Sequence, residues 1–239
     1  MYWCRLMMRL NKPWTMTENA AERGNVFVFV FLGVVLFAAL MFAMSRGLNT
    51  GSSTLSQAQA RNYAIDIITH GQRVERAVAR LLNKGISEGD ISFENDVVTG
   101  YEHTPAVSAD ARVFERTDAI GAPWQNPLVV ALPATAEQWF FSADYIVENL
   151  GSSSLSELMI GLMVRREVCA EINKYLGLSI DLSTPIGVPI SFTKFTGIYR
   201  DDVAYTYATG VLAEGCYRAD VTEGTQTGEY IYGKALVIR

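Results

Sequence analysis

The stretch ERGNVFVFVFLGVVLFAALMFAMSRG, which runs from Glu22 to Gly47, decides how the rest of the sequence is interpreted. From Val26 to Met44 every residue is apolar or glycine, a run of about 19 residues. A buried strand ordinarily ends after about eight residues, whereas a helix that crosses a bilayer needs about 20. The length of the run outweighs its local alternation of Val and Phe, and it predicts a transmembrane helix over residues 25–46.

The charged residues around this run predict its orientation. A cleavable signal peptide has a shorter apolar core, of about 7–15 residues, and ends in small residues. This run is longer, and Arg46 follows it closely. Four basic residues precede it, namely Arg5, Arg9, Lys12 and Arg23. Because cytoplasmic flanks carry an excess of Lys and Arg, we expect residues 1–24 to be a cytoplasmic basic leader and the segment after Arg46 to lie outside.

Net charge and cysteine distribution limit the function further. The 239-residue chain has a formal net charge of -5, which argues against a nucleic-acid-binding surface. Of its three cysteines, Cys4 precedes the apolar run, whereas Cys169 and Cys216 follow it. The later pair would share an oxidising compartment, where a disulfide can persist. We therefore expect a Cys169–Cys216 disulfide, with two unpaired buried thiols as the alternative.

Residues 47–85 are interpreted as a linker followed by an amphipathic helix. Ser52 or Ser53 is a credible N-cap, and the helix is expected from Ser53 to Asn83, ending before Gly85. Apolar and small residues recur at spacings of three and four: Ala60, Ala64, Ile67, Gly71, Val74, Val78 and Leu81. This stripe either covers the core of its own domain or packs in part against copies of itself.

Residues 86–239 are predicted to form an α+β extracytoplasmic head domain with a second helix and an antiparallel sheet. The SLSE motif at Ser154 has capping-box spacing, and it predicts the second helix to about Leu176. Strands are predicted in PLVVALP and QWFFSADYIV, and later in VPISFTKF, DVAYTYATGVL and GEYIYGKALVIR.

No catalytic motif is recognisable. His70 is expected at the surface or boundary of the first helix, and His103 has no second His or Cys at metal-ligand spacing. A cysteine nucleophile would require Cys169 or Cys216 to stay reduced outside the cytoplasm. The acidic loop containing Glu88, Asp90, Glu94 and Asp96 does not fit a calcium-binding loop. We expect a non-enzyme with no cofactor and no metal.

The plan of a short basic leader, an apolar helix continued by an amphipathic helix, and an α+β head with a late disulfide resembles type IV pilins and pseudopilins. In RGNVFVFVFLGVVLFAALMFAM, Gly24 stands before the apolar run, as in a prepilin that is cut after glycine. The resemblance implies cleavage between Gly24 and Asn25 by a prepilin peptidase. The fifth mature residue would be Phe29, where the family usually has Glu. Because some tip components lack that Glu, the resemblance implies a tip or initiating role.

The resemblance also implies assembly through the apolar helix. Gly33, Ala38, Ala39 and Ala43 would permit close approach of neighbouring helices, although membrane helices are ordinarily rich in such residues. The predicted function is a structural, pilin-like or minor pseudopilin subunit whose partners are the membrane and other pilin-like subunits or itself. The predicted location is the bacterial inner membrane, single-pass, with a periplasmic or extracellular head. The alternative is a single-pass envelope protein whose outer domain binds a partner protein or ligand.

Overall fold

The computed structural model describes residues 23–48, 55–114, 121–132, 138–147, 149–185, 191–202, 205–207, 213–219 and 230–239. The chain divides into two compact units, Met1–Ser53 and Thr54–Arg239. Each unit is described by itself, and the second is called the head.

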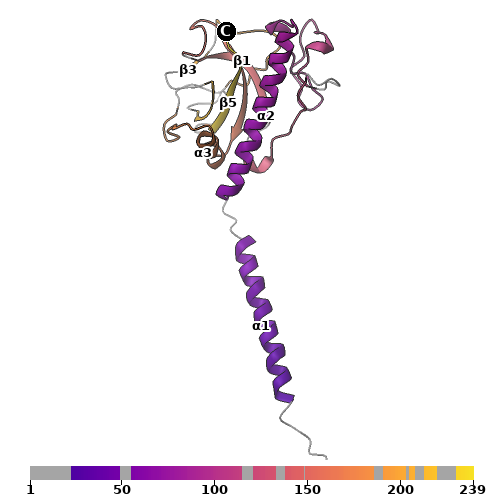
Figure 1. Ribbon diagram of the computed structural model, residues 1–239, viewed down its shortest axis with the longest axis vertical. Coiled ribbons are helices and arrows are strands. Elements are labelled where there is room, and N and C mark those ends of the chain that lie inside the picture. The colour runs from indigo at the N-terminus through magenta and orange to yellow at the C-terminus, as the bar shows by residue number, and fades with distance from the viewer. Residues whose placement is uncertain are drawn as a thin grey trace, which may run out of the picture. The chain divides into compact units, whose positions relative to one another are not determined.

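The described residues of the first unit form the helix α1 (Arg23–Leu48) (Figure 1). The prediction of a transmembrane helix over residues 25–46 is wrong: no helix in the described part of the chain is long and apolar enough to cross a membrane.

The head places helices on a sheet of five described strands, in the order β3-β1-β2-β5-β4. Strands β1 (Phe140–Val147), β2 (Glu157–Val164), β5 (Tyr230–Val237) and β4 (Glu214–Arg218) are antiparallel neighbours. The short β3 (Tyr205–Tyr207) runs parallel to β1 at the edge. The head is therefore α+β, as predicted, although its sheet is mixed rather than wholly antiparallel.

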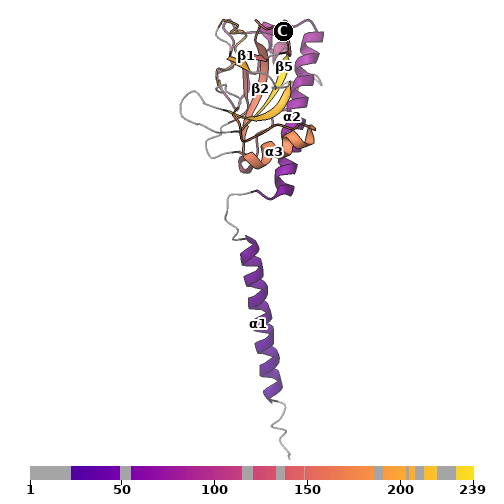
Figure 2. The ribbon, with the colours of Figure 1, turned by 90° about the vertical axis from the view of Figure 1, so that its left-hand side faces the viewer.

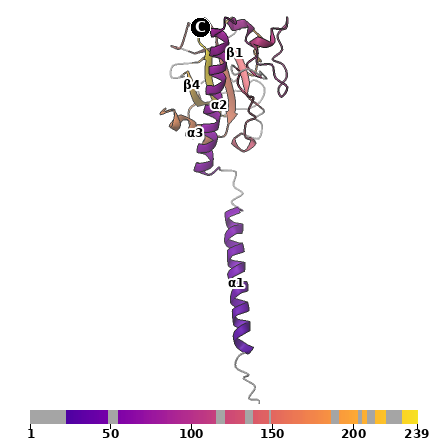
Figure 3. The ribbon, with the colours of Figure 1, turned by 45° about the vertical axis from the view of Figure 1, so that its right-hand side comes forward.

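Helix α2 (Gln57–Asn83) packs on one face of this sheet together with α3 (Arg166–Tyr175), as Figures 2 and 3 show from two sides. Ser56 caps α2 through a capping box with Gln59. The predicted caps Ser52 and Ser53 lie outside the described residues. After the helix, Gly85 takes a φ of +87°, a conformation that glycine adopts without steric cost.

The predicted apolar stripe of α2 is buried along its whole length. It contacts the core formed by β1, β2 and β5, so it covers its own domain and is not available to copies of the chain. At Gly71 the helix comes so close to β5 that a methyl group would collide with the hydroxyl of Tyr232. Lys234 of β5 binds Glu214 at 2.6 Å and Glu75 of α2 at 3.1 Å, and it thereby ties helix to sheet.

Residues 86–132 have little regular structure beyond three short 3-10 helices, η1 (Glu88–Asp90), η2 (Ala109–Ala111) and η3 (Val129–Ala131). Buried aromatic rings fix this segment to the sheet. Phe93 stacks on Phe141 of β1 with ring centroids 4.0 Å apart, and Tyr101, Phe114 and Phe195 surround the pair. The irregular backbone is thus anchored by its side chains.

Three secondary-structure predictions are wrong. The helix predicted from Ser154 to Leu176 is strand β2 followed by the shorter helix α3, because residues 157–164 are buried throughout between β1 and β5. PLVVALP forms η3 rather than a strand. Of VPISFTKF, residues 191–195 are not in a strand, and the rest lies outside the described residues. Strands β1, β3 and β5 lie within the predicted segments, whereas β4 lies outside them.

Candidate functional site

The described surface of α1 is uniformly apolar. Its ten large apolar side chains between Val28 and Met41 are 50–72% exposed, and so are the small residues between them. Phe29 and Gly33 are four residues apart and share a side of the helix, whereas Ala38 is almost opposite them. A side chain placed at Gly33 would meet nothing within 4 Å. No contact with the described residues therefore requires glycine there.

Other predicted site residues in this unit are only partly described. Gly24, Asn25 and Ala43 belong to α1, but their side chains lie outside the described set. Ala39 is exposed, like its neighbour Ala38. Of the predicted assembly residues, the structure thus describes the surroundings of Phe29, Gly33, Ala38 and Ala39.

The predicted cysteine pair lies deep in the head. The sulfur atoms of Cys169 in α3 and Cys216 in β4 are 2.05 Å apart, at disulfide distance. Asn173 of α3 reinforces the connection: its Nδ2 donates to the carbonyl of Cys216, and its Oδ1 accepts from the Cys216 amide, at 2.7 and 2.9 Å. Helix α3 and the outermost antiparallel strand are therefore joined both covalently and by two buried hydrogen bonds.

The prediction that His70 lies at a surface or boundary is wrong. The imidazole is fully buried, its ring centroid is 4.6 Å from that of Trp139, and neither ring nitrogen has a hydrogen-bond partner in the described part of the chain. Burial, with a smaller contribution from the Arg73 guanidinium, lowers the pKa of His70 from 6.5 to about 4. It is a neutral core residue with no route to a substrate.

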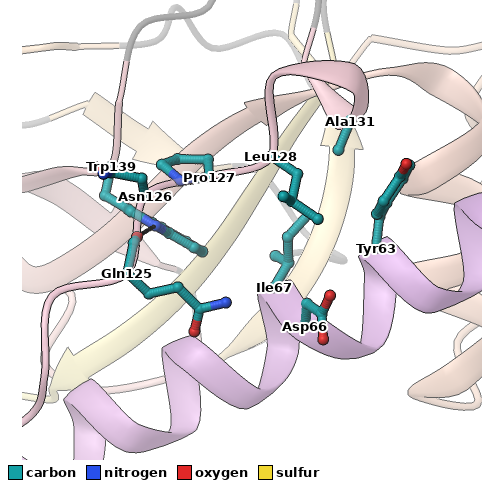
Figure 4. Close-up of a pocket in the computed structure, with 9 residues that line it drawn as sticks. All are labelled: Tyr63, Asp66, Ile67, Gln125, Asn126, Pro127, Leu128, Ala131 and Trp139. Carbon is teal, nitrogen blue, oxygen red and sulfur yellow. Dashed lines mark hydrogen bonds between the residues drawn. The ribbon is translucent and has the colours of Figure 1, made fainter.

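A shallow seam separates α2 from the segment before η3. Figure 4 shows Tyr63, Asp66 and Ile67 of α2 opposite Leu128 and its neighbours. The hollow between them measures about 10 Å³, about the space that one water needs. The indole of Trp139 closes one end by donating to the carbonyl of Gln125 at 3.0 Å. We regard the seam as a packing boundary rather than a ligand site.

A larger cavity of about 450 Å³, called here the His103 cavity, lies between three loops of the head. Its wall comprises Ile86, Gly89, Asp90, residues 103–108, Ala111 and residues 196–198. Burial lowers the pKa of His103, while Asp90, a backbone hydrogen bond with Ile91, and Glu94 oppose that shift. The imidazole is therefore neutral near pH 7.

The acidic loop containing Glu88, Asp90, Glu94 and Asp96 is partly engaged in ion pairs. Glu94 binds Arg112 at 2.7 Å, and Glu88 lies 3.5 Å from Arg239. Among the described residues no group of three or more His, Cys, Asp or Glu side chains is arranged to hold a metal ion. The loop contributes Asp90 to the wall of the His103 cavity.

No family model matches this chain, and the curated proteins and solved structures contain no significant match to it.

Sequence reasoning missed the His103 cavity because its residues come from segments about 100 positions apart. The only local signal was a histidine in the irregular segment GYEHTP, next to a Thr104–Pro105 bond that is cis in the structure. Neither feature identifies a cavity without the loop of residues 196–198, which packs against the histidine ring through Gly197.

Proposed function

We propose that this protein is a structural, pilin-like subunit that assembles with other such subunits, or with copies of itself, through α1. The observation that carries the proposal is the contiguous apolar surface of α1 between Val28 and Met41. Soluble monomers rarely expose apolar patches larger than a few hundred Å². Each large apolar side chain that becomes buried contributes about 1.5–3 kcal/mol, so packing with like helices would be strongly favoured.

Gly33 supports close packing between helices. Glycine inside a helix costs about 1 kcal/mol relative to alanine, and no atom of the chain crowds this position. A small residue at a helix surface lets a neighbouring backbone approach closely. The head supports the proposal in a different way, because its own core is formed by described residues from Ala60 onward.

The disulfide pair supports a location for the head outside the reducing cytoplasm, in the periplasm or beyond it. Disulfides persist in oxidising compartments, and the paired sulfur atoms of Cys169 and Cys216 lie in the head. In a pilin-like subunit, cleavage after Gly24 would make Asn25 the first residue and Phe29 the fifth. Sequencing the N-terminus of the native protein tests this step, and a mature chain that retains residues 1–24 would contradict it.

Assembly is tested by cysteine cross-linking in cells. In a Cys4→Ser background, single cysteines are placed on one side of α1 at Phe29, Gly33 and Leu36, and on the opposite side at Phe31, Val34 and Ala38. Val97, which is 51% exposed on the head, provides the control position. We expect multimers with the three-to-four-residue periodicity of one helix face, centred on Gly33. Cross-linking no stronger in α1 than at Val97 would refute assembly through this helix.

A second candidate function is a head that binds a partner or ligand, which the His103 cavity favours. The two functions predict different results, because loss of cross-linking in α1 leaves binding by the head intact.

A further inference from the structure

A second cavity of the head, called here the Asp144 cavity, lies between β1 and the loop of residues 191–200. Its volume is about 210 Å³. The loop is fixed beside the strand by its backbone, because the amides of Phe195 and Arg200 donate to carbonyls of β1 at 2.9 and 3.2 Å. The cavity is therefore bounded on both sides by hydrogen-bonded backbone.

Asp144 supplies a buried carboxylate with one oxygen open to this cavity. The residue is only 4% exposed. Its Oδ2 accepts from the hydroxyl of Ser191 at 2.7 Å. Its Oδ1 accepts no hydrogen bond from a described residue, and it is not among the buried polar atoms that are sealed from solvent. Because a buried carboxylate oxygen without a donor is unfavourable, Oδ1 favours an occupant that brings an N–H or O–H group.

A guanidinium group lies beside the same carboxylate. Arg200 Nη1 is 3.8 Å from Asp144 Oδ2, which is close enough for an ion pair but beyond hydrogen-bond distance. Among the described residues, the side chain of Arg200 bonds only Thr193 Oγ1, at 3.4 Å, and it is 44% exposed. A guanidinium has five N–H donors, so several of them can bind an acceptor in the cavity.

The lining carries charges of both signs. Asp144 is negative, whereas Arg200 and Lys194 are positive. A lone cation would be repelled by the two basic side chains, and a lone anion by the buried carboxylate. A zwitterion is complementary to both signs. Because Asp144 and Arg200 are only 3.8 Å apart, the ammonium and carboxylate of that zwitterion must be adjacent, as they are in an α-amino acid.

We propose that the Asp144 cavity binds a free α-amino acid with a small side chain. Its ammonium donates to Asp144 Oδ1, its carboxylate accepts from Arg200, and its side chain lies against Ile198. The volume of about 210 Å³ is below the range that begins at about 300 Å³ for drug-sized ligands, which limits the size of that side chain. A peptide end does not fit, because neither end carries both charged groups on one carbon.

The experiment uses the full chain in a mild detergent, with L-alanine as the probe. Methyl NMR signals of Ala143, Thr193 and Ile198 report binding directly. Ethylamine carries only the positive charge, propionate only the negative one, and 4-aminobutyrate carries both but far apart. We expect saturable shifts with L-alanine, with a Kd on the order of 1 mM for so small a ligand, and binding at least tenfold weaker with the other three probes.

Two substitutions in the cavity should each weaken L-alanine binding about tenfold or more. Asp144→Asn removes the charge that the ammonium needs and keeps an acceptor for Ser191. Arg200→Gln removes the partner of the carboxylate. The matched control is Arg61→Gln, which removes the same charge from an exposed position of α2 outside the cavity and should leave the Kd unchanged.

Absence of saturable shifts with L-alanine would overturn the proposal. So would equally tight binding of ethylamine, propionate or 4-aminobutyrate, or equal weakening by Arg61→Gln. If Asp144→Asn fails to fold, Arg200→Gln decides the question, because that side chain is largely outside the core. The result is independent of assembly through α1, which the cross-linking experiment tests separately.

Discussion

Acidification should destabilise the head through His70, and replacing His70 by Phe should abolish most of that effect. The pKa of the folded-state imidazole is about 4, against 6.5 for an ordinary histidine. The folded head therefore excludes a proton that the unfolded chain accepts. The contribution of neutral His70 to the unfolding free energy is fully present above pH 6.5, and it is lost as the pH falls toward 4.

The magnitude follows from the two pKa values. Their separation corresponds to about 3.4 kcal/mol of unfolding free energy, of which about 3 kcal/mol is lost by pH 4. Because typical domains have only about 5–15 kcal/mol in total, this loss should be visible as a large decrease in the urea midpoint. At pH 7.5, His70→Phe should be at least as stable as the wild type, because it removes two unpaired buried nitrogens and keeps a ring against Trp139.

The assay is equilibrium urea unfolding of a fragment spanning residues 54–239, followed by tryptophan fluorescence between pH 7.5 and 4. The difference in unfolding free energy between the wild type and His70→Phe separates the contribution of His70 from those of two other titratable side chains. His103, whose pKa is also lowered by burial, acts in the same direction, whereas Glu157, whose pKa is raised by burial, acts in the opposite one. Parallel stability curves for the two proteins across this pH range would refute the reasoning.

Three further predictions concern the contacts between helices and sheet. Gly71→Ala should cost about 1–3 kcal/mol of unfolding free energy, because the added methyl group overpacks against β5. Gln72→Ala, at the exposed neighbouring position, should change the unfolding free energy by less than about 0.5 kcal/mol. Cys169→Ala should lower the unfolding free energy by about 2–4 kcal/mol. A reducing agent should lower the Tm of the wild type but not that of Cys169→Ala. Lys234→Met should cost about 3 kcal/mol of unfolding free energy, because it leaves the largely buried Glu214 carboxylate without its ammonium partner. Glu75→Gln, at a side chain that is 44% exposed, should cost under about 1 kcal/mol, and chemical unfolding checks both.

Elements with a strong local period were predictable. The stripe of α2 was found because helical spacing brings its residues to one face whatever they pack against, and Gly85 ended the helix as expected. Strand β2 was not, because every residue of ELMIGLMV after Glu157 is apolar or glycine, so the segment has no period of its own. Its SLSE neighbour mimics a capping box. Only its position between β1 and β5 makes it a strand.

The candidate site was less predictable than the fold. His70 is on the buried side of α2, and the sequence signal for this was its spacing of three residues from Ile67. The surroundings of His103 include Ile91 and Gly197, neither of which is its neighbour in the sequence. Tertiary contacts of this kind have no local sequence signature.

The position of β5 in the sheet has a consequence for how the protein is made. β5 is the last strand along the chain, yet it lies between β2 and β4, and β4 pairs with no other described strand. The sheet therefore cannot close while residues 230–237 are still inside the ribosome. Until they emerge, Cys216 belongs to a strand without its sheet partner. A disulfide that forms earlier would form before the sheet is complete. The correct pairing of Cys169 with Cys216 therefore depends on β5, the last of these strands to be synthesised.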